Sequence, residues 1–415
     1  MRQIGHFIGG KQVAGTSGRT SNVYNPATGE VQATVALASD AEMDAAVQSA
    51  KAAQPKWAAT NPQRRARVFM KFVQLLNDNM NELAELLSKE HGKTIEDSKG
   101  DIIRGLEVCE FVIGIPHLAK SEFTEGAGPN IDMYSIRQAV GIGAGITPFN
   151  FPAMIPMWMF APAIACGNAF ILKPSERDPS VPIRLAELMI EAGLPAGILN
   201  VVNGDKGAVD AILTHPDISA VSFVGSTPIA RYVYGTAAQN GKRAQCFGGA
   251  KNHMIIMPDA DLDQAANALM GAGYGSAGER CMAISVAVPV GEETANRLIA
   301  KLTPMVESLR IGPYSDEKAD LGPVVTKEAQ ARIMGLINKG VDEGAKLVVD
   351  GRNFKLQGYE DGYFVGGCLF DNVTPDMDIY KTEIFGPVLS ILSYEDDADA
   401  VRIANDTVYG LAAYP

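Results

Sequence analysis

The hydrophobic positions along the first third of the chain predict short strands followed by packed helices. Residues 4–36 combine short apolar runs with turn signals, which is typical of a β-rich edge. Ser39 and Glu42 then have the spacing of a capping box, and the apolar residues behind them recur every three or four positions. The same periodicity predicts a second helix around residues 68–76 and a third over residues 96–113.

From residue 169 onward the pattern becomes a regular alternation of strands and helices. Strands are expected at residues 169–172, 198–202 and 220–224, and helices at residues 181–192, 208–213 and 228–238. Such alternation predicts an α/β fold with a parallel sheet covered by helices on both faces. Because ligands of these sheets bind beyond the carboxyl ends of the strands, we expect binding residues there.

The segment from Gly141 to Leu172 carries no charge and is long enough to cross a bilayer. It contains four prolines, at positions 148, 152, 156 and 162. In lipid these would leave backbone groups unsatisfied, whereas a buried loop, helix and strand accommodate them. We therefore predict a buried core segment and no membrane partner.

Composition narrows the class of partner and the compartment. The formal charge of −12 argues against a nucleic-acid surface, so small molecules are the expected partners. The five cysteines are scattered without a Cys-x-x-Cys pair, which favours reduced thiols and a cytoplasmic location. The N-terminus lacks a secretory signal, and neither cysteines nor histidines have the spacing of a metal site.

One cysteine, Cys281, lies in a stretch of small residues from Gly271 to Ala283. Glycines leave room for a ligand, and backbone N–H groups near a thiolate can lower its pKa and hold an oxyanion. Cys281 is therefore a candidate nucleophile. The alternative is a small buried side chain in a tight helix contact, which is the common situation of a free cysteine.

Two pairs of polar residues follow predicted strands of the α/β segment. Lys173 and Glu176 follow the first strand, where they can exchange hydrogen bonds with ribose hydroxyls. Gly225 and Ser226 follow the third strand and open a helix, so their N–H groups can face a pyrophosphate. Neither pair belongs to a complete nucleotide-binding fingerprint, and ordinary strand-to-helix turn chemistry is the alternative.

Two further patterns have plain structural interpretations. Arg104 stands near Glu107 and Glu110 on the third predicted helix, which by itself suggests a solvated, salt-bridged face. The aspartates from Asp259 to Asp263 resemble the start of a calcium loop but lack its glycine and glutamate, so a helix cap is the better interpretation.

The motifs taken together resemble the aldehyde dehydrogenase superfamily along essentially the whole chain. They are Ile146-Thr-Pro-Phe-Asn-Phe-Pro152, Leu172-Lys-Pro-Ser-Glu176, Phe223-Val-Gly-Ser226, Gly248-Gly-Ala-Lys251, Gly278-Glu-Arg-Cys281 and Glu383-Ile-Phe-Gly-Pro387. The resemblance implies a Rossmann-type NAD-binding domain, an α/β catalytic domain and a small β oligomerisation flap. It places the NAD-binding domain at residues 1–120 and 139–246, the oligomerisation hairpin at residues 121–138, and the catalytic domain at residues 247–415.

The resemblance also implies a role for each motif residue. The Cys281 thiolate would attack an aldehyde, the Asn150 amide and the Cys281 N–H would hold the oxyanion, and hydride would pass to NAD. The NAD-binding residues would be Lys173 and Glu176 at the adenine ribose, Gly225 and Ser226 at the pyrophosphate, Glu383 and Phe385 at the nicotinamide end, and Phe149. Glu176 favours NAD over NADP because it would repel a 2′-phosphate. Glu279 is expected to be structural.

The sequence departs from the family pattern at Phe247, where most members have the glutamate that activates water. An apolar ring cannot act as a general base, so the thioester on Cys281 is expected to wait for another thiol. This resembles the acylating branch, which uses coenzyme A to convert malonate or methylmalonate semialdehyde to acetyl-CoA or propionyl-CoA with loss of carbon dioxide. The resemblance assigns the substrate carboxylate to Arg104 and Arg280, and a guanidinium suits that task.

The second departure is the end of the chain at Pro415, where the family normally continues. The catalytic domain is therefore expected to be incomplete at its C-terminus. The full-length family suggests a homo-oligomer, in particular a tetramer. Two alternatives to the acylating reaction stay open, namely a hydrolytic aldehyde dehydrogenase with another base and an inactive nucleotide-binding chain.

Overall fold

The structure is a computed structural model that describes residues 1–410 and the backbone strand at residues 413–414. Its contacts divide the chain into two compact units, and each unit is described by itself. The first comprises residues 1–23, 31–87 and 98–248, and the second comprises residues 24–30, 88–97 and those from 249 onward. Segments 24–30 and 88–97 thus pack with the second unit, although the sequence grouped them with residues 1–120. Of the predicted catalytic domain, Leu411, Ala412 and Pro415 lie outside the described residues.

The first unit contains the N-terminal strands and the predicted α/β alternation. Its strands are β1 (Arg2–Ile4), β2 (His6–Ile8), β3 (Lys11–Val13), β4 (Thr20–Tyr24), β5 (Val31–Ala36), β6 (Phe123–Gly128), β7 (Ile131–Tyr134), β8 (Ile142–Ile146), β9 (Ala169–Lys173), β10 (Leu199–Val201), β11 (Ile218–Val224) and β12 (Arg243–Phe247). Its helices are α1 (Asp40–Ala58), α2 (Pro62–Asp78), α3 (Met80–His91), α4 (Ile95–Ile113), α5 (Ile115–Leu118), α6 (Met154–Ala165), α7 (Ser180–Glu191), α8 (Lys206–Thr214) and α9 (Thr227–Gln239). The ends of α3 and α4 extend into the segment 88–97 that belongs to the second unit.

The main sheet of this unit has the strand order β12-β11-β8-β9-β10-β2-β3. Neighbours from β12 to β10 are parallel, and β2 and β3 are added antiparallel. The chain runs outward through β8, β9 and β10 and then returns to the other side of β8 with β11 and β12. The predicted parallel sheet is confirmed, and the strand order reverses between β8 and β11.

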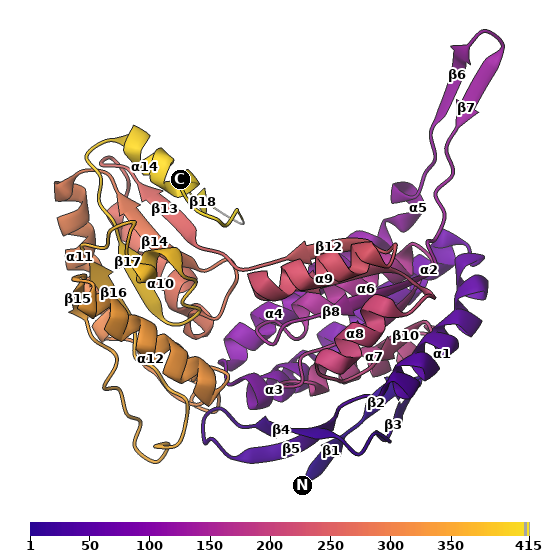
Figure 1. Cartoon of the computed structure of the whole chain (residues 1–415), viewed down its shortest axis with the longest axis horizontal. Helices are drawn as coiled ribbons and strands as arrows, with labels where there is room; N and C mark the ends of the chain where they lie inside the picture. Colours follow the sequence, from indigo (N-terminus) through magenta and orange to yellow (C-terminus); the bar gives the residue numbers. More distant parts are fainter. Residues whose placement is uncertain (411–412, 415) are drawn as a thin grey trace. The chain divides into compact units, whose positions relative to one another are not determined.

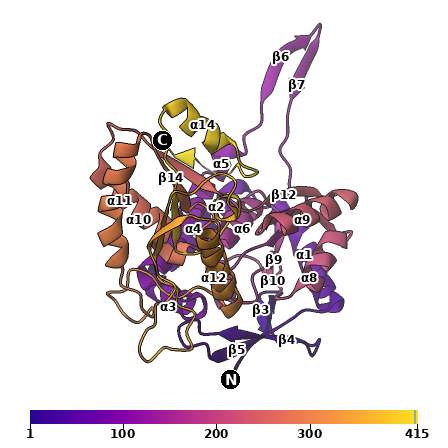
Figure 2. The ribbon, with the colours of Figure 1, turned by 60° about the vertical axis from the view of Figure 1, so that its left-hand side comes forward.

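Helices cover both faces of this sheet, as the alternation predicted (Figures 1 and 2). Helices α1, α8 and α9 pack along one face, and α2, α6 and α7 pack together on the other. The uncharged segment forms β8, α6 and β9, whose strand residues are all buried. Within the described part of the chain, no helix is long and apolar enough to cross a membrane.

The predicted capping box begins α1. Ser39 Oγ accepts the Glu42 N–H, while the Glu42 carboxylate accepts N–H groups from Ser39 at 2.8 Å and Thr16 at 2.6 Å. Burial acts to raise the pKa of the Glu42 carboxyl, but these hydrogen bonds outweigh it and lower the pKa to about 2. The carboxylate therefore joins the helix start to the loop that precedes β4.

Residues 121–138 form the predicted hairpin, in which β6 and β7 pair antiparallel. The hairpin extends away from the rest of the first unit in both views (Figures 1 and 2). Phe123, Met133 and Tyr134 are largely exposed on it. Its role in oligomerisation stays a prediction.

The second unit is built on another largely parallel sheet. Its strands are β13 (Asn252–Ile256), β14 (Ile284–Pro289), β15 (Lys346–Val349), β16 (Cys368–Asp371), β17 (Val388–Ile391) and β18 (Ala413–Tyr414). Its helices are α10 (Leu262–Tyr274), the short 3-10 helix η1 (Gly275–Gly278), α11 (Glu292–Glu307), α12 (Lys327–Asp342), α13 (Asp378–Lys381) and α14 (Asp397–Asn405). The sheet order is β15-β16-β17-β14-β13-β18, and only the β15 pairing with β16 is antiparallel among the described strands.

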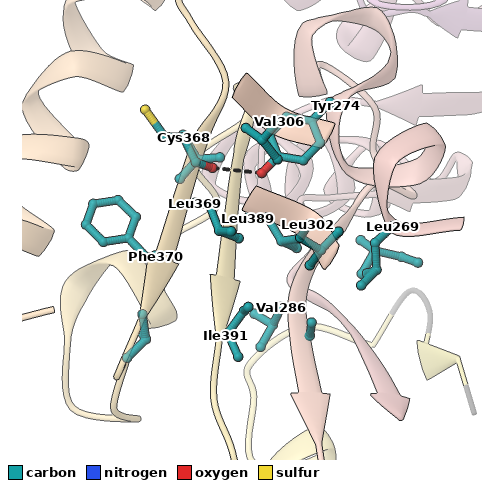
Figure 3. Close-up of a cluster of buried hydrophobic side chains, with 14 of the residues drawn as sticks. Leu269, Tyr274, Val286, Leu302, Val306, Cys368, Leu369, Phe370, Leu389 and Ile391 are labelled. Carbon is teal, nitrogen blue, oxygen red and sulfur yellow. Dashed lines mark hydrogen bonds between the residues drawn. The ribbon is translucent and has the colours of Figure 1, made fainter. Parts of the chain in front are cut away.

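The core of the second unit lies between this sheet and α10 and α11. Leu269, Leu302 and Leu389 are fully buried there, and Figure 3 shows them converging from different elements. Tyr274, at the end of α10, is buried as well, and its hydroxyl donates to the Cys368 carbonyl at 2.9 Å (Figure 3). Because a buried hydroxyl without a partner is costly, this bond fixes the end of α10 against β16.

Candidate active site

Cys281 lies in a turn between α10 and β14 in the second unit. Ser276, Ala277 and Gly278 all adopt left-handed backbone conformations, with φ of 54°, 53° and 71°. A Cβ atom on Gly278 would lie 2.0 Å from the Gly386 carbonyl oxygen, so only glycine fits there without displacement. These residues turn the chain sharply, and the turn brings Cys281 beside the segment that carries Glu383.

Two buried polar side chains, Asn252 and Glu279, hydrogen-bond at the Cys281 turn. Asn252 Nδ2 donates to the Cys281 carbonyl and to the Ala283 carbonyl, each at 2.9 Å. Glu279 is fully buried and accepts the Val325 N–H at 3.2 Å. Sequence reasoning missed Asn252, because the partners of its amide are backbone atoms of a segment about thirty residues away.

Cys281, Arg280, Glu383 and Phe385 line one cavity in the second unit, so the structure brings four predicted site residues together. The cavity is also bounded by Ala250, Asn252, Gly273, Gly278, Ala283, Ile284, Ser285, Ile384, Gly386 and Val388. Residues that carry a thiol, a guanidinium, a carboxyl and an aromatic ring therefore border one space. Such a set can bind an anionic group beside a nucleophile.

The Glu383 carboxyl lies against the Gly-Gly-Ala motif. Its Oε1 accepts the Ala250 N–H at 3.1 Å, and a Cβ atom on Gly249 would lie 2.3 Å from its Oε2. The chain then passes through Ile384, whose carbonyl accepts Arg332 Nη1 at 2.7 Å, to Phe385 in a left-handed conformation with φ of 53°. A side chain at position 249 would require the Glu383 carboxyl to move.

The surroundings of Cys281 raise the pKa of its thiol. Burial is the main cause that raises the pKa of the Cys281 thiol, and the negative charge of Glu383 adds to it. Backbone N–H groups of Met282 and Cys281 act in the opposite direction but do not outweigh these effects. Burial also raises the pKa of the Glu383 carboxyl and lowers the pKa of the neighbouring Lys251 amine to about 7.

Arg280 is held inside the same unit by two acceptors. Its Nη2 forms a short ion-pair hydrogen bond with Asp97 Oδ1, and its Nη1 donates to the Gly271 carbonyl at 3.2 Å. Asp97 was not among the residues that the sequence singled out, because nothing in its local pattern distinguishes it from an acidic residue in the first turn of a helix.

In the first unit, predicted site residues gather where the strand order reverses. Phe149 and Asn150 follow β8, and Gly225 and Ser226 follow β11, the adjacent parallel strand. Asn150 is buried, and the Phe149 ring lies 5.4 Å from the Arg177 guanidinium carbon. The carboxyl ends at such a reversal are where open α/β sheets bind ligands.

The residues after β11 begin helix α9, and one of their backbone N–H groups is already hydrogen-bonded within the protein. The Gly225 N–H donates to the Phe247 carbonyl at 3.1 Å, and a Cβ atom on Gly225 would meet the Phe223 ring at 2.5 Å. Ser226 is the N-cap residue of α9, and its side chain forms no capping hydrogen bond. A ligand at this end would therefore meet Ser226, while Gly225 supplies close packing.

Lys173 and Glu176 lie at the end of β9, one strand further along. The lysine is buried, and its Nζ lies 3.4 Å from Glu176 Oε2. Both residues therefore lie at the carboxyl edge of the sheet, where the sequence predicted them. Phe247, at the end of β12, is exposed.

Arg104 lies on α4 in the first unit and is exposed. Its Nη1 donates to the Gly100 carbonyl at 3.4 Å, one turn earlier on the same helix. In the described part of the chain it forms no ion pair with Glu107 or Glu110, so that detail of the solvated-face interpretation was wrong. The guanidinium turns toward its own helix backbone instead.

The calcium-like aspartates act as a helix cap. Asp261 is the N-cap residue of α10, and its side chain accepts the N–H groups of Asp263 and Gln264. Among the described residues, no group of three or more histidine, cysteine or acidic side chains is placed to hold a metal ion.

Residues 13–414 match the aldehyde dehydrogenase family. The chain belongs to this family. The predicted resemblance and the predicted fold class are confirmed by this match and by solved aldehyde dehydrogenase structures that superpose on the chain. The aldehyde dehydrogenase family consists of oxidoreductases, so the chain is an enzyme of that class.

Three relatives show where in the aldehyde dehydrogenase family the similarity is high. Malonate-semialdehyde dehydrogenase of Pseudomonas aeruginosa is 53% identical over 410 residues, which cover 99% of this chain and 82% of the relative. Mitochondrial methylmalonate-semialdehyde dehydrogenase of Arabidopsis thaliana, described as acylating, is 48% identical over 99% of this chain and 67% of its own length. A solved structure from Sinorhizobium meliloti, provisionally assigned as methylmalonate-semialdehyde dehydrogenase and complexed with NAD, is 81% identical. It has a TM-score of 0.95 and covers 100% of this chain and 89% of its own.

Proposed function

We propose that the chain oxidises malonate or methylmalonate semialdehyde with NAD and transfers the acyl group to coenzyme A, with loss of carbon dioxide. The names of its relatives support this substrate class. The observation that carries the proposal is that Cys281 and Arg280 line one cavity. The substrate has an aldehyde and a carboxylate separated by one carbon, and a thiol beside a guanidinium matches those two groups.

The oxidation would proceed on Cys281. Its sulfur, once deprotonated, forms a bond to the aldehyde carbon, and the carbonyl oxygen becomes an oxyanion. Loss of hydride from that carbon restores the carbonyl as a thioester. NAD, when bound, supplies the hydride acceptor. Burial and the Glu383 charge raise the pKa of the thiol, so both act against this deprotonation.

The first unit fits a dinucleotide at its strand ends. Lys173 and Glu176 lie at the end of β9, where they would exchange hydrogen bonds with ribose hydroxyls. Ser226 opens α9, a helix of 13 residues whose N-terminal N–H groups suit a pyrophosphate. Phe149 borders the same edge after β8. Glu176 favours NAD over NADP, because its carboxylate would repel the 2′-phosphate of NADP.

Transfer to coenzyme A follows from the residue at position 247. Phe247 is an exposed apolar ring and cannot take a proton from water. The thioester on Cys281 would therefore persist until the thiol of coenzyme A displaces the Cys281 sulfur. Decarboxylation would follow oxidation, because the thioester carbonyl can accept the electron pair of the breaking carbon–carboxylate bond before a proton replaces carbon dioxide.

The roles of Asn150 at the oxyanion and of Arg104 at the substrate carboxylate stay predictions from the resemblance. The same holds for the division into an NAD-binding domain, an oligomerisation hairpin and a catalytic domain. A homotetramer and a cytoplasmic location are likewise predicted and untested.

The test is the formation of NADH from malonate semialdehyde by the 415-residue chain with and without coenzyme A. The early burst is followed separately from steady turnover. We expect a burst of about one equivalent in both cases and steady turnover only with coenzyme A, because acyl transfer limits the cycle. Equal steady turnover without coenzyme A would contradict the acylating reaction.

Two alternatives make different predictions in simple assays. A hydrolytic reaction would need a base, and Glu383 is a carboxyl group in the Cys281 cavity with a raised pKa. Turnover independent of coenzyme A would favour it. An inactive nucleotide-binding chain would show a Cys281 that reacts with iodoacetamide no faster than an ordinary thiol, even with NAD bound.

A further inference from the structure

The Arg280 guanidinium is fixed on a surface made by its own turn. Asp97 Oδ1 and the Gly271 carbonyl each accept one of its N–H groups. A Cβ atom on Gly275 would lie 2.7 Å from both Nη1 and Nη2, so the guanidinium lies directly over that glycine. Its side chain is 24% exposed, and that of Asp97 is 16% exposed, so the pair is largely shielded from solvent.

The same carboxylate also holds the turn that leads to Cys281. Asp97 Oδ2 accepts the Ser276 N–H at 3.0 Å, and Ser276 is the first of the three left-handed residues. One oxygen of Asp97 therefore contacts the predicted substrate ligand, and the other contacts the backbone that positions the nucleophile. Asp97 itself belongs to segment 88–97, which packs with the second unit.

Building on the proposed function, we propose that Asp97 is a positioning residue that orients the Arg280 guanidinium for the substrate carboxylate. A guanidinium has five N–H groups, and Asp97 and Gly271 engage two of them, which leaves three donors for a second carboxylate. Without Asp97 the long side chain would have to be ordered when the substrate binds, and binding would weaken.

This role differs from two simpler ones. If Asp97 only cancelled the positive charge of Arg280, removing the negative charge of Asp97 would strengthen the binding of an anionic substrate. If Asp97 only stabilised the Cys281 turn, its loss would slow the reaction of every aldehyde equally. The positioning role predicts a loss that is confined to aldehydes with a carboxylate.

The kinetic test compares D97N with the intact chain on malonate semialdehyde and on propanal, which has no carboxylate. Asparagine keeps one oxygen for the Ser276 N–H and loses the ionic bond to Arg280. We expect KM for the semialdehyde to rise about ten-fold, kcat to change by less than about two-fold, and both constants for propanal to stay unchanged. E107Q removes a charge from an exposed position of α4 and is the matched control. Equal losses on both aldehydes, or a lower KM in D97N, would overturn the proposal.

A double-mutant cycle adds a second measure. R280A removes the predicted carboxylate ligand, so adding D97N to R280A should lower kcat/KM for the semialdehyde no further. Multiplicative effects would show that Asp97 acts by another route. If D97N does not fold, D97E keeps the charge but displaces the carboxylate by one methylene. D97E should then lose part of the preference for malonate semialdehyde over propanal. A D97E variant that matches the intact chain would count against the proposal.

An assay without turnover separates this proposal from the proposed function. Iodoacetate carries a carboxylate beside its reactive carbon, and iodoacetamide does not, so the ratio of their rates at Cys281 reports on Arg280. We expect R280A and D97N each to lower that ratio about five-fold or more relative to the intact chain. A ratio that falls in D97N while the intact chain fails to oxidise semialdehydes would refute the proposed function and retain the role of Asp97. An unchanged or higher ratio in D97N would refute that role.

Discussion

The two sheets place their candidate residues at opposite edges. In the first unit, Asn150, Glu176 and Ser226 come after parallel strands, at the carboxyl edge. In the second unit, Cys281 comes before β14 and Glu383 comes before β17, at the amino edge of parallel strands. Two sheets of the same class thus build different kinds of site.

The two edges supply different backbone groups and electric fields to a site. At a carboxyl edge the following helices begin, so their N–H groups and the positive ends of their dipoles favour an anion such as a pyrophosphate. At an amino edge the preceding helices have ended, and no such field lowers the pKa of a thiol. The second unit uses a strained turn and buried side chains to hold Cys281, and the pKa of the thiol is raised.

The largest effect that would sharpen this comparison is the loss of the nucleophile at the amino edge. C281S should lower NADH formation on the order of 10³-fold or more, because a serine hydroxyl is a far weaker nucleophile without a base. Binding of NAD, measured by titration, should stay within about two-fold. C368A changes a buried cysteine of the same unit and should retain activity, and an equal loss in both variants would contradict the assignment of Cys281.

The next effect tests whether the strained turn is required. G278A places a methyl group against the Gly386 carbonyl at a left-handed position, and should lower the free energy of unfolding by about 2–4 kcal/mol. Turnover should fall about 100-fold, since a displacement of the nucleophile by about 1 Å is enough for that. Denaturant unfolding and steady-state kinetics measure the two effects. G335A, which adds a methyl group in open space on α12, is the control. A G278A variant as stable and as active as G335A would show that the turn tolerates a side chain.

The third effect belongs to the carboxyl edge. E176A removes a predicted acceptor for ribose hydroxyls and should weaken NAD binding about ten-fold. The rate of Cys281 alkylation without NAD should not change in E176A, because Glu176 belongs to the first unit and Cys281 to the second. Calorimetry and mass spectrometry provide the two readouts, with E125A on the hairpin as a control. Unaltered NAD affinity in E176A would contradict the prediction that the adenine ribose binds at this edge.

The smallest effect concerns the charge beside the thiol. Burial and then the Glu383 charge raise the pKa of Cys281, so E383Q should lower that pKa toward the ordinary thiol value. Because the thiolate is the reactive form, the rise of alkylation rate with pH should move to lower pH, and the rate at neutral pH should increase about two-fold or more. E307Q, an exposed change on α11, should leave the profile in place. A profile that moves to higher pH in E383Q would reverse the sign of this interaction.

The amino-acid sequence by itself determined the local elements and the chemistry they carry. Alternation of apolar runs predicted the strands and helices between residues 169 and 238 within a few residues, because packing on both faces of a sheet imposes that pattern. The capping box at Ser39 and Glu42 and the hairpin at residues 121–138 were equally local. Cys281 could be chosen because its own stretch suggests a nucleophile, whereas Glu383 was assigned only through the family resemblance.

Only the tertiary structure decided which residues share a site and which hold it in place. Asp97 and Arg280 are 183 positions apart, and Asn252 contacts carbonyls 29 and 31 positions away, so no local spacing could reveal either contact. The segments 24–30 and 88–97 pack with the second unit for the same reason. The pKa of Cys281 was also beyond sequence reasoning: small neighbours suggested an activated thiol, whereas burial and the Glu383 charge, both products of folding, raise it.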